Sequence, residues 1–118
     1  MNERLDSDLE PAREEIDRRS GPVLLEFGAD WCPRCQAIQS VLSETLAENS
    51  NVEHIRIEDG KGKPLGRSFR VKLWPTLVFM HDGRIVSLLV RPSAERIVKG
   101  FEELRKAAAA NRESVGRS

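Results

Sequence analysis

The feature that most constrains the fold of this chain is a pair of cysteines between an apolar run and an amphipathic pattern. Cys32 and Cys35 are its only cysteines, and they lie within residues 31–35, WCPRC. Residues three apart share one face of a helix, about 5–6 Å apart at Cβ, so the two thiols can form a disulfide after side-chain rotation. A Cys-X-X-Cys pair at a strand-to-helix junction in a small α/β chain predicts a dithiol redox site.

The segments on either side of the motif support this placement. Val23–Gly28 is apolar enough to be a central strand that is buried on both faces. Pro33 suits the first position of the next helix, whose core-facing stripe is expected at Ile38, Val41, Leu42, Thr45 and Leu46.

The remaining segments predict an α/β fold with a central mixed sheet of about four strands flanked by helices. Residues 1–20 contribute an N-terminal helix of the same domain, residues 21–106 form its body, and residues 107–118 are expected to fray. The body also contains a second strand, a short helix, a β-hairpin around an Asp-Gly turn and a last helix, at Val52–Ile57, Leu65–Phe69, Thr76–Val90 and Ser93–Leu104. In the last helix, Ile97, Val98, Phe101 and Leu104 are expected to face inward.

Composition excludes several classes of partner. The 118 residues hold 19 Lys plus Arg and 19 Asp plus Glu, so neither nucleic acid nor an anionic membrane surface is expected as the main partner. No apolar run approaches the ~20 residues of a membrane span. Met1 to Arg19 lacks the apolar segment of a secretory signal. We expect a cytoplasmic monomer, although a chain from which a secretory signal had been removed would have the same sequence features.

A structural zinc site is the alternative to redox chemistry at the two cysteines. Such a site needs four ligands, and only His54 and His81 could complete one. They are predicted on a strand and at a hairpin end, so we favour the dithiol. No metal, flavin or nucleotide cofactor is expected.

Three stretches of the sequence, in order and at matching separations, resemble the thioredoxin family. They are residues 25–35 (LEFGADWCPRC), 74–79 (WPTLVF) and the Asp82-Gly83 turn, and the likeness extends over about residues 23–104. The resemblance implies a thioredoxin-like fold and disulfide exchange with protein partners. It implies that Cys32 is the attacking thiol, that Cys35 is the buried resolving thiol and that Pro75 is a cis-proline facing them.

The chain departs from thioredoxin proper at several positions. Pro33-Arg34 replaces Gly-Pro between the cysteines, and a proline there looks more like glutaredoxins and bacterial disulfide oxidases. Glu26 takes the place of a buried aspartate, Gly28 that of a tryptophan, and Arg91 that of a glycine lining the substrate groove. The N-terminal strand of thioredoxin is expected to be absent.

The carboxylate of Glu26 has two interpretations. It could be a strand-edge side chain that reaches solvent, because glutamate is rarely buried. Alternatively, it accepts the proton of Cys35, with a pKa raised by desolvation. A pairing with His54 is possible, but a surface position for His54 is favoured.

The remaining candidate residues are expected to contact the substrate. Trp31 and Trp74 either pack in the core or form an apolar collar that docks a partner. The charge of Arg34 beside a thiolate favours the reduced state. Substrate-contacting residues are thus predicted to be Trp31, Pro33, Arg34, Trp74, Pro75 and Arg91.

The sequence therefore predicts a thiol–disulfide oxidoreductase that acts on protein substrates. A separate reductase or thiol pool is expected to reduce its disulfide again. An oxidase or isomerase with a dedicated partner would use the same chemistry. A different class remains open, namely a thioredoxin-like binding module, assembly factor or redox sensor whose dithiol switches docking without turnover.

Overall fold

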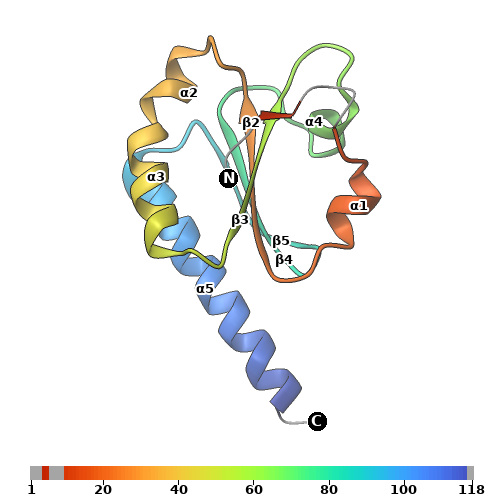
Figure 1. The fold of residues 1–118 in the computed structure, drawn as a ribbon, viewed down its shortest axis with the longest axis vertical. Helices are drawn as coiled ribbons and strands as arrows, with labels where there is room; N and C mark the ends of the chain where they lie inside the picture. The colour runs from red at the N-terminus through yellow and green to blue at the C-terminus, as the bar shows by residue number, and fades with distance from the viewer. Residues whose placement is uncertain (1–3, 6–9, 117–118) are drawn as a thin grey trace.

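A central β-sheet lies between two layers of helices (Figure 1). The structure is a computed structural model and describes residues 4–5 and 10–116. The strands follow the order β1-β3-β2-β4-β5 across the sheet. Strand β3 runs parallel to β1 and β2, whereas β4 is antiparallel to β2 and β5. The strand bounds are β1 Arg4–Leu5, β2 Pro22–Gly28, β3 Glu53–Glu58, β4 Thr76–His81 and β5 Arg84–Val90.

The predicted mixed sheet of four strands is confirmed by β2 to β5, but the expected absence of an N-terminal strand is wrong. Arg4 and Leu5 pair in parallel with Arg56 and Ile57 and add β1 at the edge of the sheet. Two residues are too few to show the period-2 alternation by which a strand is recognised in a sequence.

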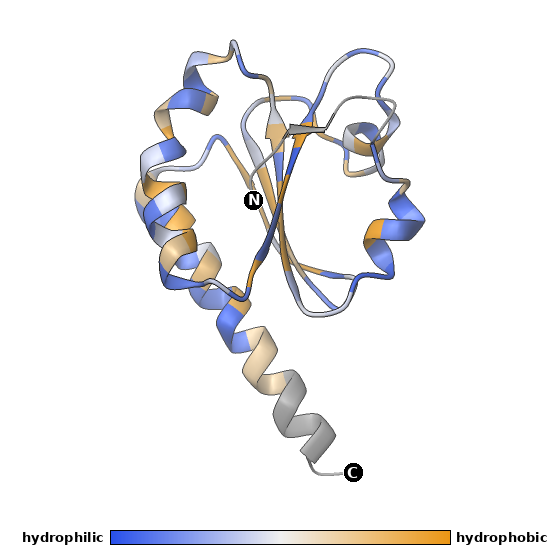
Figure 2. Cartoon of the chain, in the orientation of Figure 1, coloured by the Kyte–Doolittle hydropathy of each residue, from blue (hydrophilic) through white to orange (hydrophobic). Residues whose placement is uncertain are grey.

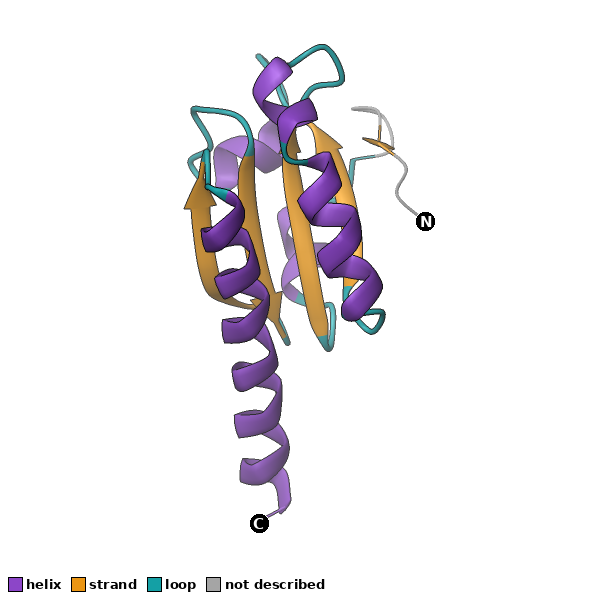
Figure 3. Cartoon of the chain, turned by 90° about the vertical axis from the view of Figure 1, so that its left-hand side faces the viewer, coloured by secondary structure: helices purple, strands orange, loops and turns teal. Residues whose placement is uncertain are grey.

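The helices divide between the two faces of the sheet. In Figure 1, α1 and α4 cover one face and α2, α3 and α5 cover the other; Figure 3 shows α3 and α5 in front of the sheet, running roughly along the strands. Within the described part of the chain, no helix is both long and apolar enough to cross a bilayer. The bounds are α1 Arg13–Asp17, α2 Pro33–Ala37, α3 Gln39–Glu48, α4 Pro64–Ser68 and α5 Ala94–Gly116.

Two predicted helices differ from the structure. Helix α1 is shorter than the N-terminal helix expected within residues 1–20, and residues 1–3 and 6–9 of that range fall outside the described residues. The helix expected after Pro33 is divided into α2 and α3 at Ile38, where ψ is −1° rather than the helical value near −42°. Ile38 is nevertheless buried in the core, as predicted.

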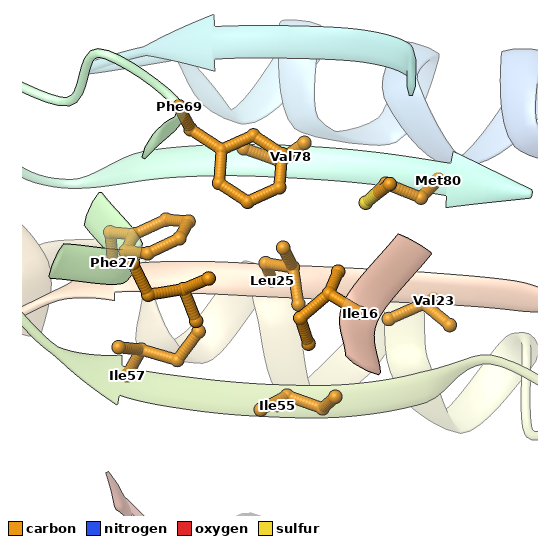
Figure 4. Packing of buried hydrophobic residues seen from close by; sticks show 10 residues of the cluster. Ile16, Val23, Leu25, Phe27, Ile55, Ile57, Phe69, Val78 and Met80 are labelled. Carbon is orange, nitrogen blue, oxygen red and sulfur yellow. The ribbon is translucent and has the colours of Figure 1, made fainter. Parts of the chain in front are cut away.

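The side chains of the strands alternate between two hydrophobic clusters. Val23, Leu25 and Phe27 of β2 pack toward α1 and α4 (Figure 4), whereas Leu24 packs against α3 and α5. Along β3, hydrophobic and hydrophilic residues alternate instead (Figure 2), and its buried residues, Ile55 and Ile57, both belong to the cluster that packs toward α1 and α4. Because side chains alternate along a strand, Glu26 lies on the same face as Leu24, under α2 and α3.

The hairpin and the last helix position the far side of the site. Asp82 and Gly83 have φ values of 51° and 79°, as the tight turn between β4 and β5 requires. Helix α5 begins where the Ser93 hydroxyl accepts from the Arg96 N–H, and it runs past residue 106 to Gly116. Fraying of its end in solution stays a prediction. Val98 is 41% exposed, so its predicted inward position is wrong.

Candidate active site

The two cysteines lie where the chain leaves β2 and enters α2. Cys32 caps the helix, and its Sγ accepts the backbone N–H of Cys35 at 3.2 Å. Both cysteines are reduced thiols, and they expose 6% and 2% of their surface. Cys32 lines a groove, whereas Cys35 is not among the residues that line it.

Several groups around Cys32 favour its thiolate. Burial raises the pKa of the Cys32 thiol, but the hydrogen bond from the Cys35 thiol and those from the backbone N–H groups of Cys35 and Arg34 lower it. The positive charge of Arg91 lowers it further, and the pKa of Cys32 lies below its ordinary value. A thiolate is the nucleophilic form of cysteine.

The sulfur of Cys35 fills the space that a side chain at position 28 would need. A Cβ added to Gly28 would lie 2.6 Å from Cys35 Sγ. Glycine at the last residue of β2 therefore permits the close approach of strand and thiol. The position where the thioredoxins that this sequence resembles have a tryptophan thus lies directly beside the sulfur of Cys35.

Glu26 is fully buried, so its interpretation as a solvent-reaching side chain is wrong. Its Oε2 accepts from Gln39 Nε2 at 2.7 Å, and its Oε1 lies 2.8 Å from His54 Nε2 and 3.4 Å from Arg56 Nε. The Gln39 amide also donates to the carbonyl of Cys35 at 2.8 Å. Glu26 is thereby linked through Gln39 to the helix that carries the dithiol.

The predicted direction of the Glu26 pKa is also wrong. Burial raises the pKa of the carboxyl group, but hydrogen bonds from His54 and Gln39 and the charges of His54 and Arg56 outweigh it. The pKa of Glu26 is therefore lowered, and the carboxylate stays ionised. The favoured surface position of His54 is wrong as well, because its side chain is 5% exposed.

The two tryptophans form an edge-to-face pair beside Cys32. Their ring centroids lie 5.5 Å apart with planes at 71°. Trp31 is 73% exposed, whereas Trp74 packs against the cluster of Ala29, Cys32 and Cys35. The Trp74 indole N–H donates to Asp59 Oδ2 at 2.8 Å, which fixes the ring. Of the two interpretations that the sequence allowed, core packing thus applies to Trp74 and an exposed apolar collar applies to Trp31.

Pro75 and Arg91 form the opposite side of the site. The Trp74–Pro75 peptide bond is cis. Arg91 has a φ of 48°, in the left-handed region that non-glycine residues seldom occupy. Its backbone N–H donates to the Pro75 carbonyl at 2.8 Å, and its Nε donates to the Trp74 carbonyl at 3.0 Å. Arg91 therefore holds the segment that faces Cys32.

The candidate zinc ligands do not converge on the cysteines. His54 bonds to Glu26, and His81 Nδ1 lies 3.4 Å from Asp82 Oδ2 in the hairpin. Over residues 10–110, no three His, Cys, Asp or Glu side chains are placed to hold one metal ion.

Sequence reasoning did not identify three residues that the structure adds. Gln39 and Arg56 contact Glu26, and Lys72 lines the groove beside Cys32. Arg56 could have been recognised if the pairing of β2 with β3 were known, because it lies opposite Glu26 in that register.

Comparison with known proteins agrees with this geometry. The thioredoxin family model matches residues 8–103. The reduced form of thioredoxin 2 from Pseudomonas aeruginosa is 54% identical, with a TM-score of 0.72, over 80% of this chain and 89% of that one. Thioredoxins H5 and H3 of Arabidopsis thaliana are 31% and 26% identical, over 64% and 75% of both chains, respectively.

The order of the strands, the Cys-X-X-Cys pair at the start of a helix and a cis-proline preceded by Trp74, which packs against the cysteines, occur together here. The family match extends over most of the sequence, and thioredoxin homologues are disulfide oxidoreductases. The chain belongs to the thioredoxin family.

Proposed function

We propose that this protein exchanges disulfides with protein substrates, with Cys32 as the nucleophile and Cys35 as the resolving thiol. The observation that carries the proposal is the set of hydrogen bonds on Cys32 Sγ at the rim of a groove, which favour a thiolate where a substrate can reach it. Thiolate concentration and access set the rate of thiol–disulfide exchange.

The reaction proceeds in two exchanges. The Cys32 thiolate attacks one sulfur of a substrate disulfide, forms a Cys32–substrate bond and releases the other substrate sulfur as a thiolate, which takes a proton from water. Cys35 then loses its proton and its sulfur attacks Cys32 Sγ, which breaks the Cys32–substrate bond and releases the second substrate sulfur as a thiolate. That thiolate takes up a proton, which balances the proton that Cys35 has lost. The substrate gains two electrons and two protons, and the protein is left with a Cys32–Cys35 disulfide. A separate reductase or thiol pool restores the dithiol.

The contacts of Glu26 support a positioning role in the second exchange. The carboxylate reaches Cys35 through the Gln39 amide, which bonds to both Glu26 Oε2 and the Cys35 carbonyl. A carboxylate with a lowered pKa is a weak base, so its main contribution is to hold α2 in place. Acceptance of the Cys35 proton by Glu26 stays a prediction.

The substrate contacts are proposed along the groove next to Cys32. Trp31 and Trp74 offer apolar area, Pro33 lines the groove, and Pro75 lines a neighbouring pocket that shares Arg34 and Arg91 with it. Arg34 and Arg91 also border this surface. Large, partly exposed aromatic residues of this kind are enriched at protein interfaces.

Catalytic reduction of insulin by dithiothreitol tests the proposal. We expect turnover by the wild-type protein, and none by Cys32→Ser or by Cys35→Ser. Lack of turnover in the wild type, with ready formation of its own disulfide, would instead support a redox-sensing module without catalytic activity.

A further inference from the structure

A groove of about 420 Å³ opens beside Cys32 and is built from three separate parts of the chain. Its apolar surface includes Trp31 and Leu73, which are 73% and 47% exposed. Its charged residues come from helix α2, from the segment before Pro75 and from the residue after β5; they are Arg34, Lys72 and Arg91.

All the charge on this groove is positive. Its lining contains no aspartate or glutamate. In the described part of the chain, none of the three cations has a carboxylate within 4.0 Å, although other basic residues do form ion pairs. The full chain has a formal net charge of zero, so the excess is local to the groove.

Arg91 is fixed in the groove by its backbone and by one edge of its side chain. The N–H donates to Pro75 and Nε donates to the Trp74 carbonyl. A guanidinium group has five N–H donors in a planar fork, and Nε accounts for only one of them. The Arg91 guanidinium is therefore a cation fixed in position beside Cys32. Its charge also lowers the pKa of the Cys32 thiol.

We infer that the groove selects protein disulfides flanked by aspartate or glutamate, with Arg91 and Lys72 as specificity-determining residues. The inference rests on the proposed function and names its substrate class. Carboxylates beside the substrate disulfide would meet three cations that lack acidic partners, so attraction assists both encounter and orientation. The same cations disfavour a substrate with lysines at those positions.

Paired peptides test the selectivity directly. Two disulfide-linked peptides are compared that differ only at the residues on both sides of each cysteine. One peptide has Glu at these positions and the other has Lys. The second-order rate constant for their reduction by the reduced protein is followed by stopped-flow fluorescence of Trp31 and Trp74. At low ionic strength we expect the Glu peptide to react roughly tenfold faster, equivalent to about 1.4 kcal/mol. Salt near 0.5 M should remove most of this ratio because it screens exposed charges.

Variants assign the effect to the groove. Lys72→Gln and Arg91→Gln should each lower the ratio of the two rate constants at least twofold. The ratio is the readout because Arg91 also changes the reactivity of Cys32 toward every disulfide. Lys106→Gln removes one charge from a 73% exposed side chain of α5, outside the groove, and should leave the ratio unchanged.

Each outcome has a defined meaning. Equal rates for the two peptides, or a ratio unaffected by both groove variants, would overturn the inference and leave the proposed function intact. If neither peptide is reduced, the proposed function itself fails.

Discussion

The carboxylate of Glu26 and the ring of His54 lie 2.8 Å apart between neighbouring strands, under the helices that carry the dithiol. Each strand places the side chain on the face covered by α2 and α3, and both side chains are nearly inaccessible to solvent. Arg56 and Gln39 complete the surroundings of the carboxylate. The buried charge is thus compensated by three neighbours, an arrangement that makes the stability of the protein depend on the ionisation of Glu26.

Acid should weaken the fold through Glu26. Its pKa is lowered in the folded state from the ordinary glutamate value of 4.5, so the unfolded chain binds the proton first as the pH falls. The contribution of Glu26 is fully present above pH 4.5 and is lost as the pH falls through the lower folded pKa. Urea unfolding at several pH values should show that the free energy of unfolding of the wild type decreases as the pH falls below 4.5. In Glu26→Gln this decrease should be smaller.

Glu26→Gln should also lower the free energy of unfolding at neutral pH, by about 2 kcal/mol, because hydrogen bonds to a buried charged group are weakened. Glu53→Gln is the control, since its pair with Arg19 is exposed and worth little. Equal stability of Glu26→Gln and wild type at pH 7 would contradict the role of the carboxylate described here.

Arg91 should affect the reactivity of Cys32 more than Arg34 does. The charge of Arg91 lowers the pKa of Cys32, whereas Arg34 acts through its backbone N–H, which survives a change of side chain. In Arg91→Gln the alkylation rate of Cys32 by iodoacetamide should therefore rise at a higher pH than in the wild type. Arg34→Gln is the matched control, and a shift in it as large as that of Arg91→Gln would show that this assignment is wrong.

Gly28 should tolerate no side chain. In Gly28→Ala the new Cβ would meet Cys35 Sγ at 2.6 Å, so the strand or the thiol must move. We expect a loss of about 1–3 kcal/mol in the free energy of unfolding, as is usual for overpacked cores, together with slower formation of the Cys32–Cys35 disulfide. Gly60→Ala is the control, because a Cβ at Gly60 has no neighbour within 4 Å. Identical unfolding curves for the two variants would refute this account of Gly28.

The sequence was sufficient for the features that depend on local pattern. The apolar run before Cys32, the proline after it and the Asp82-Gly83 turn predicted a strand, a helix start and a hairpin, because each signal lies within a few residues. Long-range pairing was not predictable in the same way. The contact between Glu26 and His54 depends on the register of β2 against β3, which a single sequence does not specify.

Arg91 shows a second limit. Its side chain reaches the Trp74 carbonyl because its backbone adopts a left-handed conformation after β5, a conformation that nothing in an arginine side chain favours. The sequence placed Arg91 in the groove only through the family resemblance. The basic character of the groove depends on three segments that meet after folding, so Lys72 went unrecognised.

Intact-mass analysis of Cys35→Ser after incubation with a disulfide-linked peptide tests the central claim most directly. If Cys32 is the nucleophile and Cys35 resolves the intermediate, the variant should accumulate an adduct of one peptide half, joined to Cys32 and released by dithiothreitol. Cys32→Ser should form no such adduct, since Cys35 is 2% exposed. An unmodified Cys35→Ser protein, or an adduct on Cys35 in the Cys32→Ser protein, would contradict the assignment of the two thiols.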